Sequence, residues 1–225
     1  MRIGFYGHSN CAYRDDDSFL DIVSKQLAGI VVNTGVKQGS EERILFELKK
    51  NKNLDIAIIF HCLPKFLFLP GCDRDINVHD IERKRADQLF SNDHLDTEFT
   101  ATNQPLFKKV FENNENFFNA VNTFKNYFYH PDLIMNRYYG ALIQIDQYLQ
   151  NKNIKVIHVL DKTYPLPSWF KFSTGVIDYE IMDIVKSNKS TNPFFANCIS
   201  KDGNRLVATR ILTIISKELT CTSVL

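Results

Sequence analysis

Short apolar runs alternate with longer amphipathic stretches along this 225-residue chain, and this alternation is the strongest constraint on its fold. The run DIAIIF at 55–60 is continuous, rich in β-branched residues and too short for a buried helix, and IKVIHVL at 154–160 is another short, mostly apolar run. Each therefore predicts a strand that is covered on both faces. Shorter runs at 3–6 and 30–33 predict two more strands. Because strands that alternate with helices form parallel sheets, we expect a doubly wound α/β domain.

The stretches between these runs have helical spacing and helix end signals. Asp17 or Ser18 can cap the first helix, and EERILFELKK carries acids in its first turn and lysines in its last, as the helix dipole favours. Pro131 is suited to opening a long helix. The predicted helices cover 19–27, 41–50, 132–150 and 205–219. Residues 161–196 have no clear pattern, and a phenylalanine-rich stretch within 65–130 predicts a helical insertion in a single domain over 1–225.

Composition excludes several classes of protein. A formal net charge of +1 gives no electrostatic basis for binding nucleic acid or an anionic membrane. No apolar run approaches the roughly 18 residues that span a bilayer, and the start lacks the features of a signal peptide. Five cysteines, odd in number and without paired spacing, fit a reducing compartment better than a disulfide framework. We therefore expect a protein of a reducing compartment such as the cytoplasm, and no motif calls for a bound cofactor.

The loops at the carboxyl ends of the predicted strands contain the residues with the most chemistry. Ligands of doubly wound sheets bind at this edge. The loops hold Ser9 and Asn10 after the first strand, Gly39 after the second, and His61 and Cys62 after the third; Cys198 precedes the last helix. The topology predicts that these residues lie near one crevice.

Several segments at this edge resemble the blocks of the SGNH (GDSL-type) ester hydrolases. The runs GFYGHSN and DSFLDIVSKQL are similar to the first block, in which a strand ends in Gly-Asp-Ser and a helix follows a loop. VVNTGVKQGSEERI resembles the second block, and DIAIIFHCLP occupies the place of the third. NRYYGALIQIDQYLQNKNIKVIHVLD and NCISKDGNRLVATRIL resemble the later helix-strand passage and the closing segment. The match spans most of the chain outside 65–130, and it implies an SGNH-like three-layer α/β/α domain with a flavodoxin-like parallel sheet.

The resemblance also implies roles for individual residues. Ser9 matches the nucleophile, and its own N–H matches one donor to the oxyanion. Gly39 matches the residue whose backbone N–H is the second donor. The chemistry of the family needs a Ser that is made nucleophilic by a His, an acid that orients the His, and donors aimed at the oxyanion.

The chain departs from the family pattern at the other catalytic positions. His61, Cys62, Leu63 and Pro64 occupy the region of the third oxyanion donor, which is an Asn in the family. In the closing segment, alignment on SKDGN places Cys198 at the catalytic His and Phe195 at its Asp. His8 replaces the Asp of the first block, and no His follows His158. The triad of the family is therefore absent from the sequence.

Each remaining candidate has a structural interpretation beside a functional one. Ser9 is either the nucleophile or a turn or capping residue. His61 or His8 is either a substitute base or hydrogen-bonded structure, and Cys198 is an alternative nucleophile. Three cysteines near the crevice, with His8 and His61, raise the question of a soft-metal site, but no Cys-x-x-Cys or His-x-x-x-His spacing supports one, so we expect none.

Two functions follow from these observations. The first is an SGNH-like domain with a degenerate ester-hydrolase site, a pseudoenzyme that binds a ligand or serves as a structural part of an assembly. A phage-encoded virion component is one form of this hypothesis. The alternative is an active serine esterase or deacetylase that uses Ser9 with His61 or His8 as base. The expected partners are an acyl or carbohydrate ester ligand, or protein assembly partners.

Overall fold

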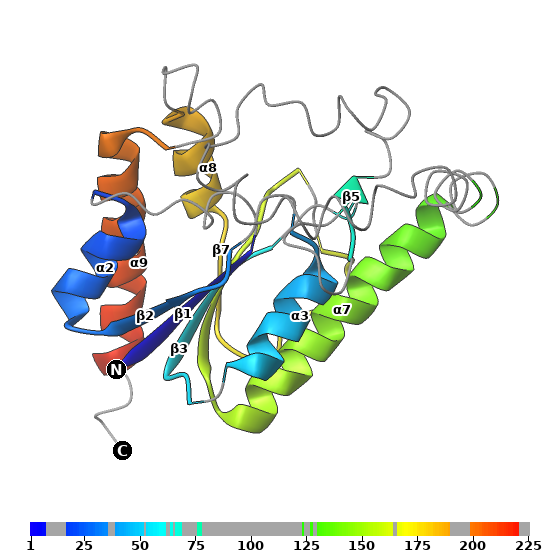
Figure 1. The fold of residues 1–225 in the computed structure, drawn as a ribbon, viewed down its shortest axis with the longest axis horizontal. Helices are drawn as coiled ribbons and strands as arrows, with labels where there is room; N and C mark the ends of the chain where they lie inside the picture. The colour runs from blue at the N-terminus through cyan, green and yellow to red at the C-terminus, as the bar shows by residue number, and fades with distance from the viewer. Residues whose placement is uncertain are drawn as a thin grey trace, which may run out of the picture.

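The computed structural model of the protein describes residues 1–7, 17–35, 39–51, 53–61, 64, 66–68, 76–77, 123, 127, 130–163, 166–189 and 199–220. A five-stranded sheet in the order β2-β1-β3-β6-β7 runs through its centre, and every neighbouring pair is parallel (Figure 1). Its strands are β1 (Arg2–Gly7), β2 (Ile30–Asn33), β3 (Ile56–Phe60), β6 (Lys155–Val159) and β7 (Val176–Asp178). The α/β class and the parallel pairing of the first four strands expected from the sequence are confirmed.

Helices cover both faces of the sheet and complete the three layers (Figure 1). One face carries α2 (Phe19–Leu27), α8 (Glu180–Ser187) and α9 (Lys201–Thr220), and the other carries α3 (Glu41–Lys50) and α7 (Pro131–Lys152). Each face has its own apolar core, because residues from the strands pack against α2, α8 and α9 on one side and against α3 and α7 on the other.

The central strand β3 shows why its sequence is apolar without interruption. All five of its residues are buried. Ile56, Ile58 and Phe60 belong to the core under α2 and α9, whereas Ala57 and Ile59 belong to the core under α3 and α7. Successive side chains of a strand point to opposite faces, so a strand covered by helices on both sides needs apolar residues at every position.

The helix ends follow the local signals in the sequence. The Ser18 hydroxyl caps α2 by accepting from the Asp21 N–H, and the Ser40 hydroxyl caps α3 by accepting from the Arg43 N–H. Pro131 opens α7 behind a His130 cap. A side-chain cap of this kind contributes about 1 kcal/mol, and it satisfies an N–H that the helix itself leaves unbonded.

Two elements lie within 161–196, where the residues show no clear pattern, and one helix is longer than expected. Strand β7 and helix α8 follow each other within 176–187. Helix α9 begins at Lys201, four residues before the expected start at Arg205. Within the expected helical insertion at 65–130, the described residues include β4 (Phe66–Leu67) and β5 (Ile76–Asn77), which form an antiparallel pair. Most of the insertion lies outside the described residues.

Candidate functional site

The carboxyl ends of four strands form one row of the sheet. Gly7 of β1 is in register with Phe60 of β3, Phe60 with Val159 of β6, and Val159 with Asp178 of β7. His61 continues β3 past this row, and its backbone N–H donates to the Val159 carbonyl at 3.0 Å. His61 therefore lies at the edge where the sequence predicts the site.

The other predicted site residues are distributed between described and undescribed parts of the chain. Gly39 is buried beside the start of α3. His8, Ser9, Asn10, Cys62 and Cys198 lie outside the described residues. The approach of Gly39 to Ser9, and the clustering of these side chains, stay predictions.

Strand β1 has to end in glycine at this edge. Gly7 has a φ of +133°, a conformation that L side chains rarely adopt. A Cβ at this position would lie 2.2 Å from the Phe60 carbonyl oxygen of the neighbouring strand. The glycine before His8 and Ser9 is thus required by the backbone, whether or not Ser9 has a chemical role.

A chain of three buried polar side chains links α3, β3 and β6 at this edge. Nδ1 of His61 lies 3.0 Å from a carboxylate oxygen of Glu41, and Nε2 of His61 lies 2.9 Å from Nδ1 of His158. The Glu41 and His61 side chains are each 1% exposed, and His158 is fully buried. Buried polar groups are stable only when they are hydrogen-bonded, and this chain supplies the partners.

Phe172 packs on both imidazole rings. Its ring is stacked on His158, with 3.6 Å between ring centroids and 16° between the planes, and it lies 5.3 Å from His61. Burial lowers the pKa of His158 well below 6.5, the nearby His61 lowers it further, and the Thr174 backbone opposes this effect. His158 is therefore neutral at pH 7, which is the form that an apolar stacking partner favours.

One ring nitrogen of the Glu41–His61–His158 series is left, Nε2 of His158. It is buried and has no hydrogen bond of good geometry within the part of the chain that the structure describes. The Thr174 backbone is the polar group that acts on this imidazole. The chain of hydrogen bonds thus ends at the segment that contains Phe172 and Thr174.

The contacts of His61 differ from those of a catalytic base. In a triad the acid holds Nδ1 of the histidine, and Nε2 takes the proton from the serine hydroxyl. Glu41 is placed as such an acid, but Nε2 of His61 faces His158. In this arrangement both ring nitrogens of His61 are occupied by protein groups, and the ring is screened from solvent.

Asp146 of α7 fastens the segment that carries Phe172. Its two carboxylate oxygens accept four hydrogen bonds, from the backbone N–H and the hydroxyl of Ser173 and of Thr174, at 2.7–3.2 Å. Asp146 is itself buried. A buried carboxylate with four donors fixes the backbone next to Phe172, and it thereby helps to hold the phenyl ring on the two histidines.

The closing motif shared with the SGNH pattern has structural partners. The Ser200 hydroxyl accepts from the Gly203 N–H at 3.1 Å at the start of α9. The Asn204 side chain accepts from the Phe19 N–H at 3.0 Å, which ties the start of α9 to the start of α2. A Cβ on Gly203 would lie 2.5 Å from side-chain atoms of Asn188 and Ile199, so the close approach of this turn requires glycine.

Sequence reasoning singled out His61 but missed Glu41 and His158. The sequence marks Glu41 only as an acid in the first turn of a helix. His158 carried a signal, since it is the one polar side chain between apolar residues in the run VIHVL. A histidine inside a buried strand needs a hydrogen-bond partner, and this requirement could have marked it as part of a polar cluster.

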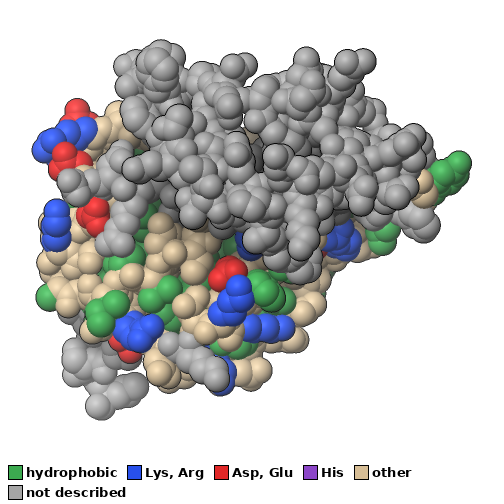
Figure 2. Space-filling view, viewed as in Figure 1, with side chains coloured by type: hydrophobic (Ala, Val, Ile, Leu, Met, Phe, Trp, Pro, Cys, Tyr) green, Lys and Arg blue, Asp and Glu red, His purple; other side chains and the backbone are tan. Residues whose placement is uncertain are grey.

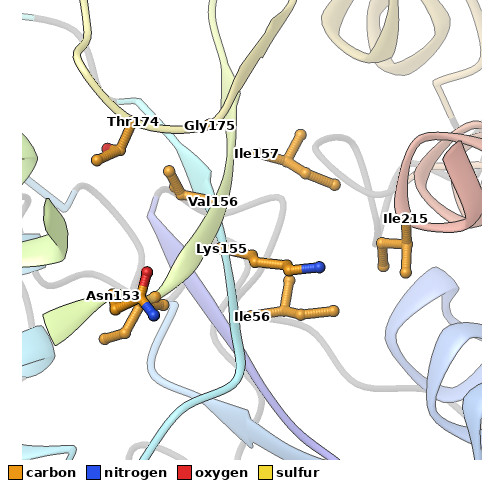
Figure 3. A pocket seen from close by; sticks show the side chains of 9 residues that line it. Ile56, Asn153, Lys155, Val156, Ile157, Thr174, Gly175 and Ile215 are labelled. Carbon is orange, nitrogen blue, oxygen red and sulfur yellow. The ribbon is translucent and has the colours of Figure 1, made fainter. Parts of the chain in front are cut away.

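A separate pocket of about 210 Å³ lies at the opposite end of the sheet, where β3 and β6 begin (Figure 3). Lys155 extends across it toward Ile215 of α9 (Figure 3). Its lining residues are Ile56, Asn153, Ile154, Lys155, Val156, Ile157, Thr174, Gly175 and Ile215. This set contains no histidine, acid or cysteine, and the hydroxyl of Thr174 donates to Asp146 of α7, so the pocket lacks a hydroxyl paired with a histidine base.

The described residues include neither a metal-binding cluster nor a membrane-spanning helix. Within the ranges given above, no group of three or more His, Cys, Asp or Glu side chains is placed to hold a metal ion. No helix in those ranges is long and apolar enough to cross a bilayer. Figure 2 shows basic and acidic side chains interspersed on the described part of one face. The described part of this face shows no strongly basic area of the kind that binds nucleic acid.

Comparisons with known proteins give a fold-level likeness alone. No protein-family model matches the chain, and no curated protein matches it. Among solved structures, the chain is similar to an acetyl xylan esterase, AlAXEase, at 12% identity and a TM-score of 0.44, over 95% of this chain and 98% of that one.

A second similar structure is a putative lipolytic protein of the G-D-S-L family from Desulfitobacterium hafniense DCB-2. The identity is 14% and the TM-score 0.35, over 95% of this chain and 98% of that one. The G-D-S-L family is the one that the sequence motifs resemble. At these scores the likeness carries no argument about function, and the fold assignment rests on the sheet order and pairing given above.

Proposed function

We propose that this protein is an SGNH-hydrolase-like domain with a degenerate ester-hydrolase site, which acts as a binding or structural module. One observation carries the proposal: His61 is buried between Glu41 and His158, with a partner at each ring nitrogen. A base has to reach the hydroxyl of its serine, and a ring held in this way has no nitrogen to offer.

The sequence supports the same conclusion. Cys198 stands at the position of the catalytic His, Phe195 at that of its Asp, and the third oxyanion donor is missing. A serine without its base retains only the catalysis that an oxyanion hole and binding provide. The ligand of such a module is an acyl or carbohydrate ester, or its partner is another protein of an assembly such as a virion; each of these is part of the proposal.

Hydrolysis of a nitrophenyl acetate by purified protein tests the proposal. We expect the wild type to hydrolyse the ester no more than about twofold faster than Ser9→Ala, because histidines and lysines on the surface give both proteins the same background. Removal of a triad normally lowers the rate by several orders of magnitude. The two rates are measured at equal concentrations of folded protein, checked by circular dichroism.

A large difference would support the active esterase instead. If the wild type is at least a hundredfold faster than Ser9→Ala, the degenerate-site proposal is wrong. The variants His8→Ala and His61→Gln then identify the base, because only the variant that lacks the base loses the rate that rises with pH near the usual histidine pKa of about 6.5.

A further inference from the structure

The segment 166–174 is held over the buried histidine pair by contacts of two kinds. Phe172 stacks on His158 and contacts His61. Phe170 packs in a small cluster with Tyr138 and Leu142 of α7. Asp146 binds the two residues at the end of the segment, Ser173 and Thr174. The segment is thus anchored firmly at 173–174, and its earlier part depends on ring packing.

The contact between the histidines depends on how many hydrogens the two rings carry. Nε2 of His61 and Nδ1 of His158 are 2.9 Å apart, so one nitrogen donates a single hydrogen and the other accepts it. A proton taken up by His158 puts a hydrogen on both of its nitrogens and a positive charge in a buried site, where burial and the nearby His61 both disfavour it.

The surroundings compensate charge on His61 but not on His158. The Glu41 carboxylate is 3.0 Å from His61 and stabilises positive charge on that ring. Other ionisable groups on the elements around His158 include Asp146 and Tyr138 on α7, Asp178 on β7 and Lys171 in the segment itself. Asp146 is bound by four donors, Asp178 is bound by Arg210, and Lys171 is exposed. No described acid is thus placed to accept a hydrogen bond from a protonated His158.

We propose that the histidine pair and Phe172 form a pH-sensitive latch at the candidate site. At neutral pH the latch holds 166–172 closed over His61; when His158 takes up a proton, the segment swings away about its anchor at 173–174. Opening uncovers His61 and Glu41 at the carboxyl edge of the sheet. The proposal that this controls ligand access rests on the proposed binding function of that edge.

The direction of the pH dependence follows from the state of His158. Its pKa in the folded protein is lowered by burial, so the unfolded chain binds a proton at a higher pH than the folded one. Stability linked to His158 is therefore complete above about pH 6.5, the usual histidine pKa, and is lost progressively as the pH falls below it. Local opening of the latch exposes His158 to water, and it thereby relieves the same cost of protonation without unfolding the sheet.

The only tryptophan of the chain, Trp169, reports directly on this segment. Its ring lies 5.4 Å from Tyr139 of α7 and 6.1 Å from Phe170. Tryptophan fluorescence of the full chain is measured from pH 7.5 to pH 4.5, together with far-ultraviolet circular dichroism. We expect a reversible change in emission at a pH below about 6.5, while the circular dichroism keeps its native value.

Two variants and a control tie the change to the latch. His158→Gln removes the titrating ring and is expected to abolish the transition. Phe172→Leu keeps both histidines but removes the stacked ring, and the weaker closed state should move the transition to higher pH. His130→Asn removes an exposed histidine while keeping a cap for α7, and it should leave the transition unchanged.

The outcomes separate this inference from the proposed function. The latch is wrong if the wild type shows no transition before it unfolds, if a folded His158→Gln keeps the transition, or if Phe172→Leu leaves its pH unchanged. The titration contains no ligand or ester, so its result is independent of catalysis. An active esterase with a normal fluorescence transition would overturn the proposed function and leave the latch intact.

Discussion

Replacement of Gly7 by alanine is expected to lower the free energy of unfolding by about 3 kcal/mol or more. The φ of +133° disfavours any side chain, and the new Cβ would lie 2.2 Å from the Phe60 carbonyl oxygen. That oxygen belongs to the central strand, which is paired on both sides and cannot shift without disturbing the sheet. Denaturant unfolding followed by circular dichroism measures the loss.

Gly140→Ala is the matched control for this prediction. Gly140 lies inside α7, and a Cβ there would meet no atom within 4 Å. Because alanine favours a helix over glycine, we expect this variant to be more stable than the wild type by about 0.5–1 kcal/mol. If Gly7→Ala is as stable as the wild type, β1 does not end with the backbone described here, and the geometry of the candidate edge is incorrect.

Replacement of Asp146 by alanine is expected to lower the free energy of unfolding by about 3 kcal/mol. The substitution leaves two backbone N–H groups and two hydroxyls without their acceptor at a partly buried site. Loss of a buried acceptor usually costs about 1–3 kcal/mol for each donor left unbonded, although hydroxyls can rotate to other partners. Thermal or denaturant unfolding measures this change.

Two further substitutions isolate the role of the carboxylate. Asp146→Asn keeps the size of the side chain but replaces one acceptor oxygen with a donor, so we expect a loss of about 2 kcal/mol. Asp132→Ala removes an exposed acid from the first turn of the same helix and should cost less than about 1 kcal/mol. Equal effects of Asp146→Ala and Asp132→Ala would mean that the segment 173–174 is not anchored as described.

The sequence predicts the central part of the fold because its signals there are local. The run 56–60 is apolar at every position, and the run 154–160 departs from this only at Lys155 and His158, as expected for strands of a sheet that is covered on both faces. The hydroxyls of Ser18 and Ser40 mark the starts of α2 and α3 without reference to the rest of the chain. Each of these signals involves only a few neighbouring residues, so it can be recognised in a single sequence.

The elements that sequence reasoning missed have weak local signals. Strand β7 has three residues, too few to show a period of two, and Ile177 is partly exposed. Helix α8 has eight residues, and its cap position, Tyr179, makes no side-chain capping bond. The start of α9 contains Gly203 and Asn204, which are poor helix formers, because that turn packs closely on Asn188 and ties α2 to α9.

The sequence predicts where the candidate site lies, but it does not predict which side chains contact each other there. The order of strands and loops brings His61 to the carboxyl edge, as expected from parallel topology. The bond between His61 and His158 joins residues 97 positions apart, and the bond to Glu41 joins residues 20 apart. Which of several polar residues near an edge meet each other depends on side-chain packing, which has no signature in the spacing of residues.

Proton exchange at the His61 ring tests the central claim most directly. A proton–nitrogen correlation spectrum of the histidine side chains, assigned with His61→Gln and His158→Gln, is recorded at pH 7.5, and the exposed His130 provides the reference for free exchange. We predict one ring hydrogen shared by His61 and His158 that exchanges with water far more slowly than that of His130. A His61 ring that exchanges as fast as the His130 ring would contradict the buried chain, and His61 would again be a candidate base.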